Sequence, residues 1–269
     1  MTMFVDVTGH GPNLTLLHGW GLNGAVWNGV REELAEHFTL HIIDLPGHGR
    51  SHGLPVSTLA TFVDDVAHAM PARSHLLGWS LGGHTAMALA HRYPARIDRL
   101  ITICATPRFI TRDTSDTSDT HNTHDTHNDW PHGKKPEVLA DFAQRLSTNY
   151  LATIRNFLAL QALNQPEMRE VIRKLQEAVG AHGAPSVASL AASLGILQVS
   201  DIRALVSAIS APTLVIQGDQ DALTSTGTAQ WLADNLPNST YCLIEHAAHA
   251  PFISHRDIFV DRLMAFLAT

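Results

Sequence analysis

The stretch Gly78-Trp79-Ser80-Leu81-Gly82 reads as G-x-S-x-G and lies between two runs of different character. The apolar run at 74–77 before it is typical of a buried strand, and the alanine-rich run at 83–92 after it is typical of a helix. The residues that flank the serine must be small in such a tight turn, because a Cβ atom there would strike neighbouring backbone. The pattern therefore predicts a sharp strand-turn-helix unit with the Ser80 hydroxyl exposed above a sheet, where the helix N-terminus favours developing negative charge.

The rest of the chain decides whether this turn carries chemistry, because a bare G-x-S-x-G also arises by chance as a glycine-rich turn. Short apolar runs recur, and helical patterns separate them. The expected strands are 14–17, 40–43, 75–77, 100–103, 213–216 and 241–244, and the expected helices are 27–37, 59–70, 83–92, 226–236 and 256–268. Unalternating strands interleaved with amphipathic helices indicate an α/β fold with a mostly parallel sheet covered on both faces.

This alternation stops between Pro107 and Ser210. The stretch 137–199 is rich in Leu, Ala, Gln and Arg and predicts several helices without a strand, broken at 164–166 and 183–185. We therefore expect an α/β core formed by residues 1–106 and 211–269, and an inserted all-helical cap at 107–210 that covers the pocket above Ser80. An independent helical domain is the alternative, but the chain returns directly to a strand pattern at Pro212.

Residues 113–129, DTSDTSDTHNTHDTHND, form a polar three-residue repeat without apolar anchors, which predicts a surface loop at the entrance of the cap. Its histidines His121, His124 and His127 have a spacing that would chelate a metal only weakly. We interpret them as solvated side chains and predict neither a metal nor a cofactor.

Composition limits the function classes. The 269 residues are 45% hydrophobic, enough for a sizeable core, and the formal charge of −7 argues against nucleic acid as a general partner. Cys104 and Cys242 lie in apolar runs and are expected to be buried free thiols in a reducing compartment. The start of the chain has neither a basic nor an apolar signal region, and no run reaches the ~20 apolar residues of a membrane span. A cytoplasmic protein without membrane contact is the expectation.

A serine hydroxyl needs a base, and the base needs a carboxylate that fixes its tautomer and stabilises its cation. In this architecture the order along the chain is Ser, then Asp or Glu, then His, each after its own strand. The expected strand 213–216 leads to Asp219 and Asp221, and the strand 241–244 leads to His246 and His249. We predict Asp221 as the acid, with Asp219 capping the turn, and His249 as the base, with His246 solvated in the loop.

An oxyanion also needs two backbone donors. One is expected to be the amide of Leu81, directly after the serine at the helix start. The other is expected in His18-Gly19-Trp20-Gly21, after the first apolar strand, with the amide of Trp20 as the candidate. An ordinary glycine turn is the alternative for His18-Gly19.

Taken together, these features resemble the α/β-hydrolase family, as does the turn Asp44-Leu45-Pro46-Gly47-His48-Gly49-Arg50-Ser51. Over nearly the whole chain the sequence is similar, more specifically, to the carboxylesterase family of the biotin pathway. The similarity is carried by 16–23, 26–27, 78–83, 130–131, 135–136, 157–161 and 247–255, and it breaks at 113–129.

This resemblance implies that Ser80, Asp221 and His249 form a catalytic triad, and that Trp20 and Leu81 line the oxyanion and substrate site. It also implies that the cap segment Phe142, Ala143, Gln144, Arg145 and Leu146 contacts the acyl chain. The implied reaction removes the methyl ester from a pimeloyl group carried by an acyl carrier protein, which would be the partner of a monomeric enzyme.

Charge agrees with an acidic carrier, because 130–200 holds seven Lys and Arg against five Asp and Glu. Helix faces with solvated cations explain the same count equally well. Two other functions stay open: a broad small-ester, lactone or C–C bond hydrolase with the same triad, and a non-catalytic protein that retains the fold.

Overall fold

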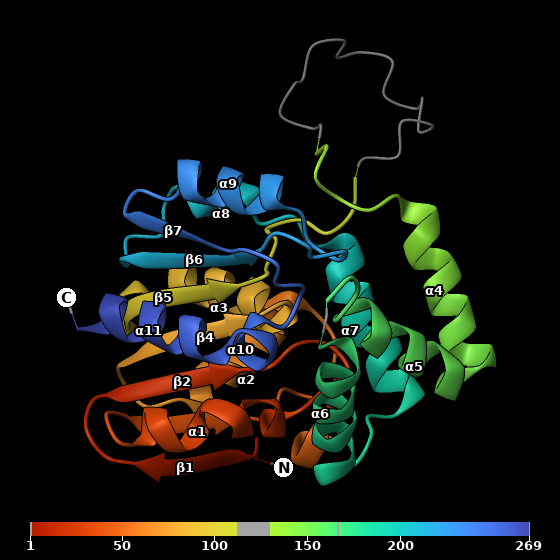
Figure 1. Cartoon of the computed structure of the whole chain (residues 1–269), viewed down its shortest axis with the longest axis horizontal. Helices are drawn as coiled ribbons and strands as arrows, with labels where there is room; N and C mark the ends of the chain where they lie inside the picture. The colour runs from red at the N-terminus through yellow and green to blue at the C-terminus, as the bar shows by residue number, and fades with distance from the viewer. Residues whose placement is uncertain (1, 112–129, 166, 269) are drawn as a thin grey trace.

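The computed structural model describes residues 2–111, 130–165 and 167–268, and a seven-stranded sheet runs through its centre (Figure 1). The strand order is β1-β3-β2-β4-β5-β6-β7, and only β1 runs antiparallel to its neighbour. The strands are β1 (Val5–Gly9), β2 (Asn13–Leu17), β3 (Thr39–Ile43), β4 (Ser74–Trp79), β5 (Ile97–Ile103), β6 (Thr213–Gly218) and β7 (Ser239–Ile244). The six predicted strands are present and the parallel α/β architecture is confirmed.

The sequence pattern missed β1 because that strand is short and lies at the edge of the sheet. Its residues VDVTG alternate in character and are all partly or fully exposed, so no apolar run marks them.

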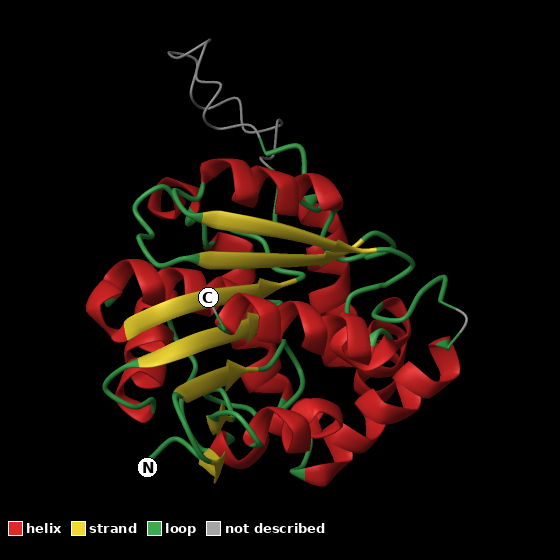
Figure 2. Cartoon of the chain, turned by 60° about the vertical axis from the view of Figure 1, so that its left-hand side comes forward, coloured by secondary structure: helices red, strands yellow, loops and turns green. Residues whose placement is uncertain are grey.

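Helices cover both faces of the sheet (Figure 2). On one face lie α1 (Asn28–Ala35), α10 (Pro251–Ser254) and α11 (Arg256–Leu267), which pack against one another. On the other lie α2 (Leu59–Ala69), α3 (Leu81–Arg92), α8 (Arg203–Val206) and α9 (Thr226–Asn235). Short 3-10 turns follow β2, β3 and α3 at Gly24–Trp27 (η1), Gly49–Ser51 (η2) and Pro94–Arg96 (η3).

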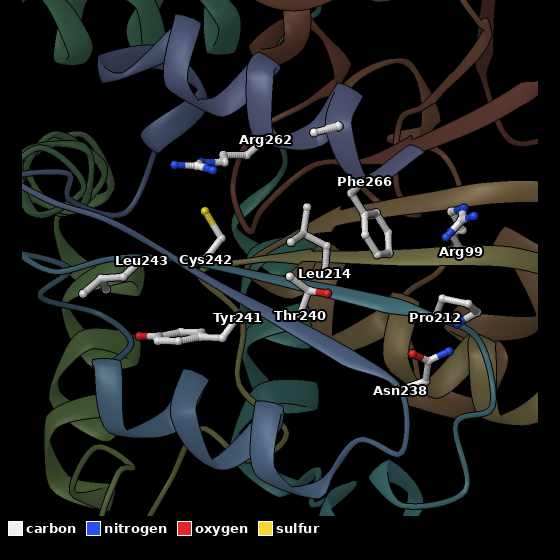
Figure 3. A pocket seen from close by; sticks show the side chains of 11 residues that line it. Arg99, Pro212, Leu214, Asn238, Thr240, Tyr241, Cys242, Leu243, Arg262 and Phe266 are labelled. Carbon is white, nitrogen blue, oxygen red and sulfur yellow. The ribbon is translucent and has the colours of Figure 1, made fainter. Parts of the chain in front are cut away.

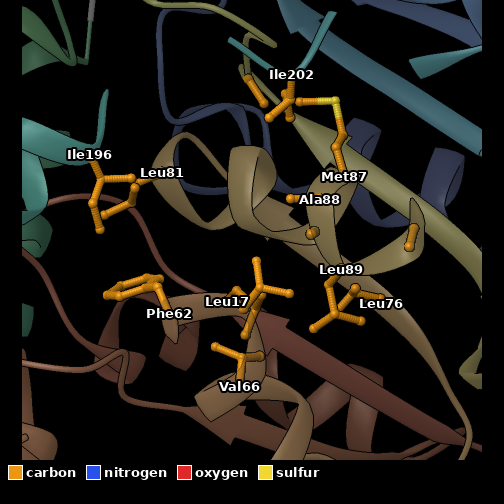
Figure 4. Close-up of a cluster of buried hydrophobic side chains, with 14 of the residues drawn as sticks. Leu17, Phe62, Val66, Leu76, Leu81, Met87, Ala88, Leu89, Ile196 and Ile202 are labelled. Atoms are coloured by element: carbon orange, nitrogen blue, oxygen red, sulfur yellow. The ribbon is translucent and has the colours of Figure 1, made fainter. Parts of the chain in front are cut away.

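The central strands contribute side chains to both of these layers. In β2, Leu14 and Leu16 belong to the apolar cluster beneath α1 and α11, whereas Leu17 belongs to the cluster beneath α2 and α3 (Figure 4). All three are fully buried, and burying a leucine side chain stabilises the fold by about 1.5–3 kcal/mol. Burial on both faces is the physical reason why these strands read as unbroken apolar runs.

Among the described residues between β5 and the short helix α8, helices replace the strand pattern: α4 (Pro136–Thr148), α5 (Tyr150–Leu160), α6 (Met168–Ala181) and α7 (Val187–Val199). We call residues 136–199 the cap. No strand occurs there among the described residues, and the breaks between α5, α6 and α7 fall where the sequence predicted them. The chain leaves the core and returns to it at adjacent points, because the Ile202 amide donates a hydrogen bond to the Pro107 carbonyl (2.9 Å).

Apolar and polar contacts join the cap to the core. Ile196 of α7 lies against Leu81 at the start of α3 (Figure 4), and Leu175 of α6 is buried in the cluster that includes η1. The Asn23 side-chain amide donates to the Ala178 carbonyl at 2.8 Å, and the Trp20 indole donates to the Leu190 carbonyl at 3.1 Å. The cap is thus packed onto the core around the loop that follows β2.

The two cysteines differ in burial. Cys104, directly after β5, is fully buried, as predicted. Cys242 is only half-buried, which corrects the prediction, because β7 is the edge strand and its apolar run is open on one side. Among the described residues no helix combines the length and the apolar character that a bilayer crossing requires.

Candidate active site

Ser80 sits on the predicted sharp turn between β4 and α3. Its backbone has φ 56° and ψ −116°, a conformation with positive φ that residues other than glycine rarely adopt. The surroundings hold it there, because the Ser80 amide donates to the Ile103 carbonyl at 3.0 Å and the Ser80 carbonyl accepts from the His84 amide at 2.9 Å. The side chain is half-buried at the carboxyl end of β4.

The two glycines of the turn are small for the reason expected from the sequence. A Cβ atom on Gly78 would lie 2.3 Å from the Gly82 carbonyl oxygen, and one on Gly82 would lie 2.4 Å from the Leu17 carbonyl oxygen. Both contacts are with backbone, which cannot rotate away. The close approach of β2, β4 and α3 that presents Ser80 therefore depends on the absence of side chains at these positions.

Asp221 follows β6 and its side chain is 0% exposed. Its carboxylate accepts hydrogen bonds from the Leu223 amide at 2.7 Å, the Thr224 hydroxyl at 2.6 Å and the His249 Nδ1–H at 2.8 Å. Burial alone would raise the pKa of this carboxyl. The positive charge available to His249 and the hydrogen bonds from His249 and Thr224 outweigh burial and lower the pKa of Asp221 below its usual range.

Asp219 has a different environment from the one predicted. It is exposed, and none of the hydrogen bonds among the described residues involves its carboxylate. The turn amides of Leu223 and Thr224 donate to Asp221 instead. This corrects the role given to Asp219, because a carboxylate two residues closer to the strand end points out to solvent.

His249 follows β7 and its side chain is 1% exposed. Besides Asp221, its loop is bonded to two other parts of the molecule: the His249 amide donates to the Gln161 carbonyl at 3.2 Å, and the Trp79 indole donates to the His249 carbonyl at 2.7 Å. Trp79 immediately precedes Ser80, so this bond ties the loop of His249 to the serine turn. The Nε2 atom of His249 is buried and makes no hydrogen bond with the described part of the chain.

His246 is exposed, as the sequence predicted, and it has a left-handed backbone with φ 61°. Its Nδ1 lies 3.4 Å from the Gln220 side-chain nitrogen, on the outside of the loop. Of the two candidate histidines, only His249 contacts the buried carboxylate.

The two expected oxyanion donors lie beside the serine turn. Leu81 is the first residue of α3, so its N–H has no acceptor within the helix. Trp20 lies in the loop after β2, and its backbone N–H donates to no acceptor among the described residues. The structure leaves both amides available, and their role as oxyanion donors stays a prediction.

His18 fixes the loop that carries Trp20. It is fully buried; its Nδ1–H donates to the Gly19 carbonyl at 2.8 Å, and its Nε2 accepts from the Leu45 amide at 2.9 Å. Burial lowers the pKa of His18, although the nearby Asp44 charge opposes the change. This neutral imidazole links the loops after β2 and β3. An ordinary glycine turn, the alternative that we considered for His18-Gly19, would not make this link.

A cavity of about 280 Å³ opens beside Ser80, between the core and the cap. Trp20 and the cap residues Phe142 and Phe157 form one wall, with the Trp20 ring edge-on to both phenylalanines at 5.4 and 5.0 Å between centroids. The remaining lining residues are Phe109, Lys134, Val138, Leu139, Leu160, Leu194, Leu197, Ala222 and Leu223. Apart from Ser80 and Lys134, every lining side chain is apolar.

The cap segment at 142–146 reaches this cavity less than the resemblance implied. Phe142 lines the cavity, but Gln144 and Arg145 are exposed, and Arg145 pairs with Asp141 on the outer face of α4. Ala143 and Leu146 pack into the apolar cluster of the core. Five consecutive residues of a helix point in all directions at 3.6 residues per turn, so one face alone can meet the ligand.

A larger cavity of about 660 Å³ lies far from these residues (Figure 3). Pro212, Asn238 and Thr240 place it at the amino-terminal ends of β6 and β7, with Arg99, Arg262 and Phe266 around it. The predicted triad and oxyanion residues follow the carboxyl ends of strands, where ligands bind in open parallel sheets. Volume alone therefore does not identify the active site.

The described residues bring one set of possible metal ligands together, with the ligand atoms of Cys104, Asp221 and His249 within 4.8 Å of one another. The set does not suit a resident metal. The Nδ1 atom of His249 is already bonded to Asp221, and burial raises the pKa of the Cys104 thiol well above its ordinary value. The histidines His121, His124 and His127 lie outside the described residues.

Sequence reasoning missed the residues that hold the acid. The Gln217 side-chain amide donates to Asp221 at 3.1 Å and to the Thr224 carbonyl at 3.1 Å, and Gln217 is fully buried. One signal was present: Gln217 is a polar residue near the end of an otherwise apolar strand. For Gln161, which holds His249 through its backbone carbonyl, no residue-type signal exists, because any residue offers that atom.

Comparison with known proteins agrees with this geometry: residues 12–256 match the family model described as alpha/beta hydrolase fold. The chain belongs to the α/β-hydrolase fold family.

Two curated relatives carry the name pimeloyl-[acyl-carrier protein] methyl ester esterase. The protein from Aeromonas hydrophila is 39% identical over 269 residues, which cover 99% of this chain and 100% of the relative. The protein from Nitrosomonas europaea is 36% identical over 260 residues, covering 97% of each chain.

Solved structures show the same fold at lower identity. A bromoperoxidase from Bacillus anthracis superposes with a TM-score of 0.85 at 21% identity, covering 99% of this chain and 95% of that one. The enol-lactonase from Burkholderia xenovorans gives 0.83 at 21% identity, with 99% and 96% covered. At this identity they bear on the fold alone.

Proposed function

We propose that this chain is a serine carboxylesterase that hydrolyses the methyl ester of pimeloyl-[acyl-carrier protein] in biotin biosynthesis, releasing methanol. The observation that carries the proposal is the buried Asp221–His249 hydrogen bond beside the Ser80 turn, at the mouth of an apolar cavity. The names of the two relatives, which align along nearly their whole length, supply the substrate.

In the proposed mechanism His249 Nε2 takes the proton of the Ser80 hydroxyl as its oxygen attacks the ester carbonyl carbon. The Leu81 and Trp20 amides stabilise the oxyanion. His249 then protonates the leaving methoxide, and methanol departs. A water molecule activated by His249 hydrolyses the acyl-serine, while Asp221 holds the imidazole and stabilises its cation.

Apolar walls suit this substrate, because a methyl ester and a chain of methylenes are uncharged. The aromatic side chains Trp20, Phe142 and Phe157 meet edge-on, and together they offer apolar surface directly beside the serine. Burying apolar surface contributes roughly 25 cal/mol per Å² to binding before ordering costs are subtracted.

The carrier protein would dock on the cap through basic residues. Arg155 on α5 and Arg169 on α6 are exposed and form no ion pair among the described residues, whereas Arg145 pairs with Asp141, and Arg173 pairs with Glu170. Unpaired cations are the better docking points for an acidic partner, because no intramolecular carboxylate competes for them. We propose that Arg155 contributes more to docking than Arg145.

The direct test incubates the enzyme with pimeloyl-[acyl-carrier protein] methyl ester and follows loss of the methyl group by mass spectrometry. Demethylated product with the wild type and none with Ser80→Ala supports the proposal. Hydrolysis of short p-nitrophenyl esters without demethylation would favour the broad small-ester hydrolase instead, and absence of both activities would favour a non-catalytic protein. Rescue of a biotin auxotroph that lacks this step is the matching test in cells.

Docking has a separate test. Replacing Arg145 and Arg155 together by alanine should weaken hydrolysis of the carrier-bound ester more than that of free esters, and the two single variants show which arginine matters. Equal losses on both substrates would reject the docking surface. We also propose that the enzyme acts as a monomer in the cytoplasm, which size-exclusion chromatography with light scattering and cell fractionation would check.

A further inference from the structure

Lys134 is the one charged residue among the described residues that line the cavity beside Ser80. It is half-buried, and its neighbours on the cavity wall include Leu139, Phe142 and Leu223. An ammonium group among apolar side chains loses hydration that must be replaced by a partner. A charge in this position therefore lowers the stability of the fold unless a ligand group or an internal acceptor binds it.

The backbone fixes where this lysine stands. The Lys134 amide donates to the Phe109 carbonyl at 2.8 Å, and the Lys134 carbonyl accepts from the Thr111 amide at 2.9 Å, so residues 109–111 and 134 form a short bridge. This bridge anchors the lysine at the cavity wall independently of any ligand.

The ammonium group makes one hydrogen bond, from Nζ to the Ala222 carbonyl at 2.8 Å. A lysine has three N–H donors, so two are not used by the described residues. Lys134 also forms no ion pair with any described Asp or Glu, in contrast to Arg145 and Arg173 on the outer face of the cap. Because Ala222 directly follows Asp221, the ammonium group lies on the side of the cavity formed by the loop after β6.

We infer that Lys134 binds an oxygen acceptor at the far end of the acyl chain, and that the enzyme therefore also hydrolyses carrier-free half-esters of linear dicarboxylic acids. In such a half-ester the methyl ester carbonyl lies at Ser80 and the free carboxylate pairs with the ammonium group. Water cleaves the bond between the acyl carbon and the methoxy oxygen: the acyl carbon gains the hydroxyl and methoxide gains the proton, giving methanol and a new carboxyl group that then releases its proton to solvent.

This inference rests on the proposed function, since it places the ester at Ser80. For the carrier-bound substrate the equivalent acceptor is the thioester carbonyl at the other end of the pimeloyl group. A charged donor facing a carboxylate makes a stronger hydrogen bond than one facing a neutral carbonyl. The free half-ester therefore gains more from Lys134 than the carrier-bound chain does.

The test compares kcat/KM for two free substrates, monomethyl pimelate and methyl heptanoate, which differ by the distal carboxylate. In the wild type the half-ester should be preferred. In Lys134→Met the ratio of half-ester to heptanoate activity should fall about 10- to 100-fold, the range expected for a hydrogen bond to a charged group. Lys135→Met is the matched control, because Lys135 is the adjacent cation, is exposed and does not line the cavity, and its ratio should equal that of the wild type.

A series of half-esters from four to nine carbons adds a second readout. The wild type should show one preferred length, set by the span from Ser80 to Lys134, and Lys134→Met should lose that optimum. If both activities fall together in Lys134→Met with the ratio unchanged, the lysine acts only by holding Ala222 and the inference is wrong. Demethylation of the carrier-bound ester without any preference for half-esters would overturn this inference alone, and the reverse outcome would overturn the proposed substrate alone.

Discussion

In the core, Asp221 and His249 are held by hydrogen bonds at strand ends and are almost fully buried, whereas in the cap Phe142 and Phe157 reach the cavity from helices whose outer faces are exposed. The core positions its polar groups through backbone: the amides of Leu223 and Thr224 bind the acid, and the Gln161 carbonyl binds the loop of the base. The cap presents apolar surface that any similar side chain would supply. From this difference we expect catalysis to be sensitive to small changes in the core, and the cap to tolerate changes that preserve its apolar surface.

The largest effect is expected at the reacting groups. Ser80→Ala and His249→Ala should each lower kcat/KM for p-nitrophenyl esters by about 10⁴-fold or more, because the nucleophile and its base act as a unit. His246→Ala, a histidine three residues away on the exposed side of the same loop, should stay within about 2-fold of the wild type. Circular dichroism checks that all three variants are folded. A loss at His246 as large as that at His249 would reverse the assignment of the base.

Asp221→Asn should lower kcat by about 10³- to 10⁴-fold, because an amide in place of the carboxylate favours the wrong tautomer of His249. Asp219→Asn should leave turnover nearly unchanged, because its carboxylate is exposed and bonded to no described residue. Steady-state kinetics on the same ester decide between them. If Asp219→Asn were the more damaging change, the buried pair described above would not be the catalytic one.

Two glycine variants test the same contrast through stability. Gly82→Ala should lower the free energy of unfolding by about 3 kcal/mol, because its Cβ would lie 2.4 Å from the Leu17 carbonyl oxygen. Gly195→Ala in α7 should raise it by about 0.5–1 kcal/mol, because the added methyl group meets no atom within 4 Å beyond its own stretch of helix and alanine is the better helix former. Urea denaturation measures both. Equal effects would mean that the core turn is less constrained than its geometry indicates.

The smallest effect concerns acid stability. Burial, with repulsion from His18, lowers the pKa of His48 to about 3, so the folded protein keeps this imidazole neutral. The stability that depends on the neutral form is fully present above pH 6.5, where the unfolded chain is also neutral, and is lost as the pH falls toward 3. Each pH unit below about 6 should therefore cost up to about 1.4 kcal/mol from His48 alone.

Urea midpoints measured from pH 7 to pH 4 check this expectation. The curve of His48→Gln should be flatter than that of the wild type, whereas His182→Gln in the cap should follow the wild-type curve. A wild-type midpoint that does not change between pH 6.5 and 4.5 would contradict the burial of a neutral His48.

The sequence predicted the parts of the fold in which one physical requirement acts alone. Burial on both sheet faces produced the apolar runs of β2, β4, β5 and β6, and the close backbone approach produced the glycines around Ser80. The acid and the base candidates were narrowed to two positions in each loop by strand order. The choice of Asp221 and His249 agrees with the pair that the structure brings into contact, and their catalytic roles stay predictions.

Other features depend on packing that a single sequence does not display. The edge strand β1 lacks an apolar run because it is exposed, and Cys242 is half-buried because β7 has no neighbour on one side. The segment 142–146 was taken as a whole, although helix geometry turns Gln144 and Arg145 away from the cavity. The hydrogen bonds from Gln217 and Thr224 to Asp221 are seen only in the structure, because the residue type of a donor does not indicate which acceptor it binds.

The hydrogen bond from the His249 amide to the Gln161 carbonyl has a consequence for protein engineering. Gln161 directly follows α5 and lies within the cap. Any chimera that takes the whole cap from a relative therefore also replaces the residue whose carbonyl binds the loop of His249. Grafts that end before position 161 keep the native hydrogen bond between residue 161 and the His249 amide, whereas longer grafts replace one of its two partners. A cap exchange that leaves the position of His249 unchanged should therefore end within the cap, before Gln161, and not at the junction between the cap and the sheet.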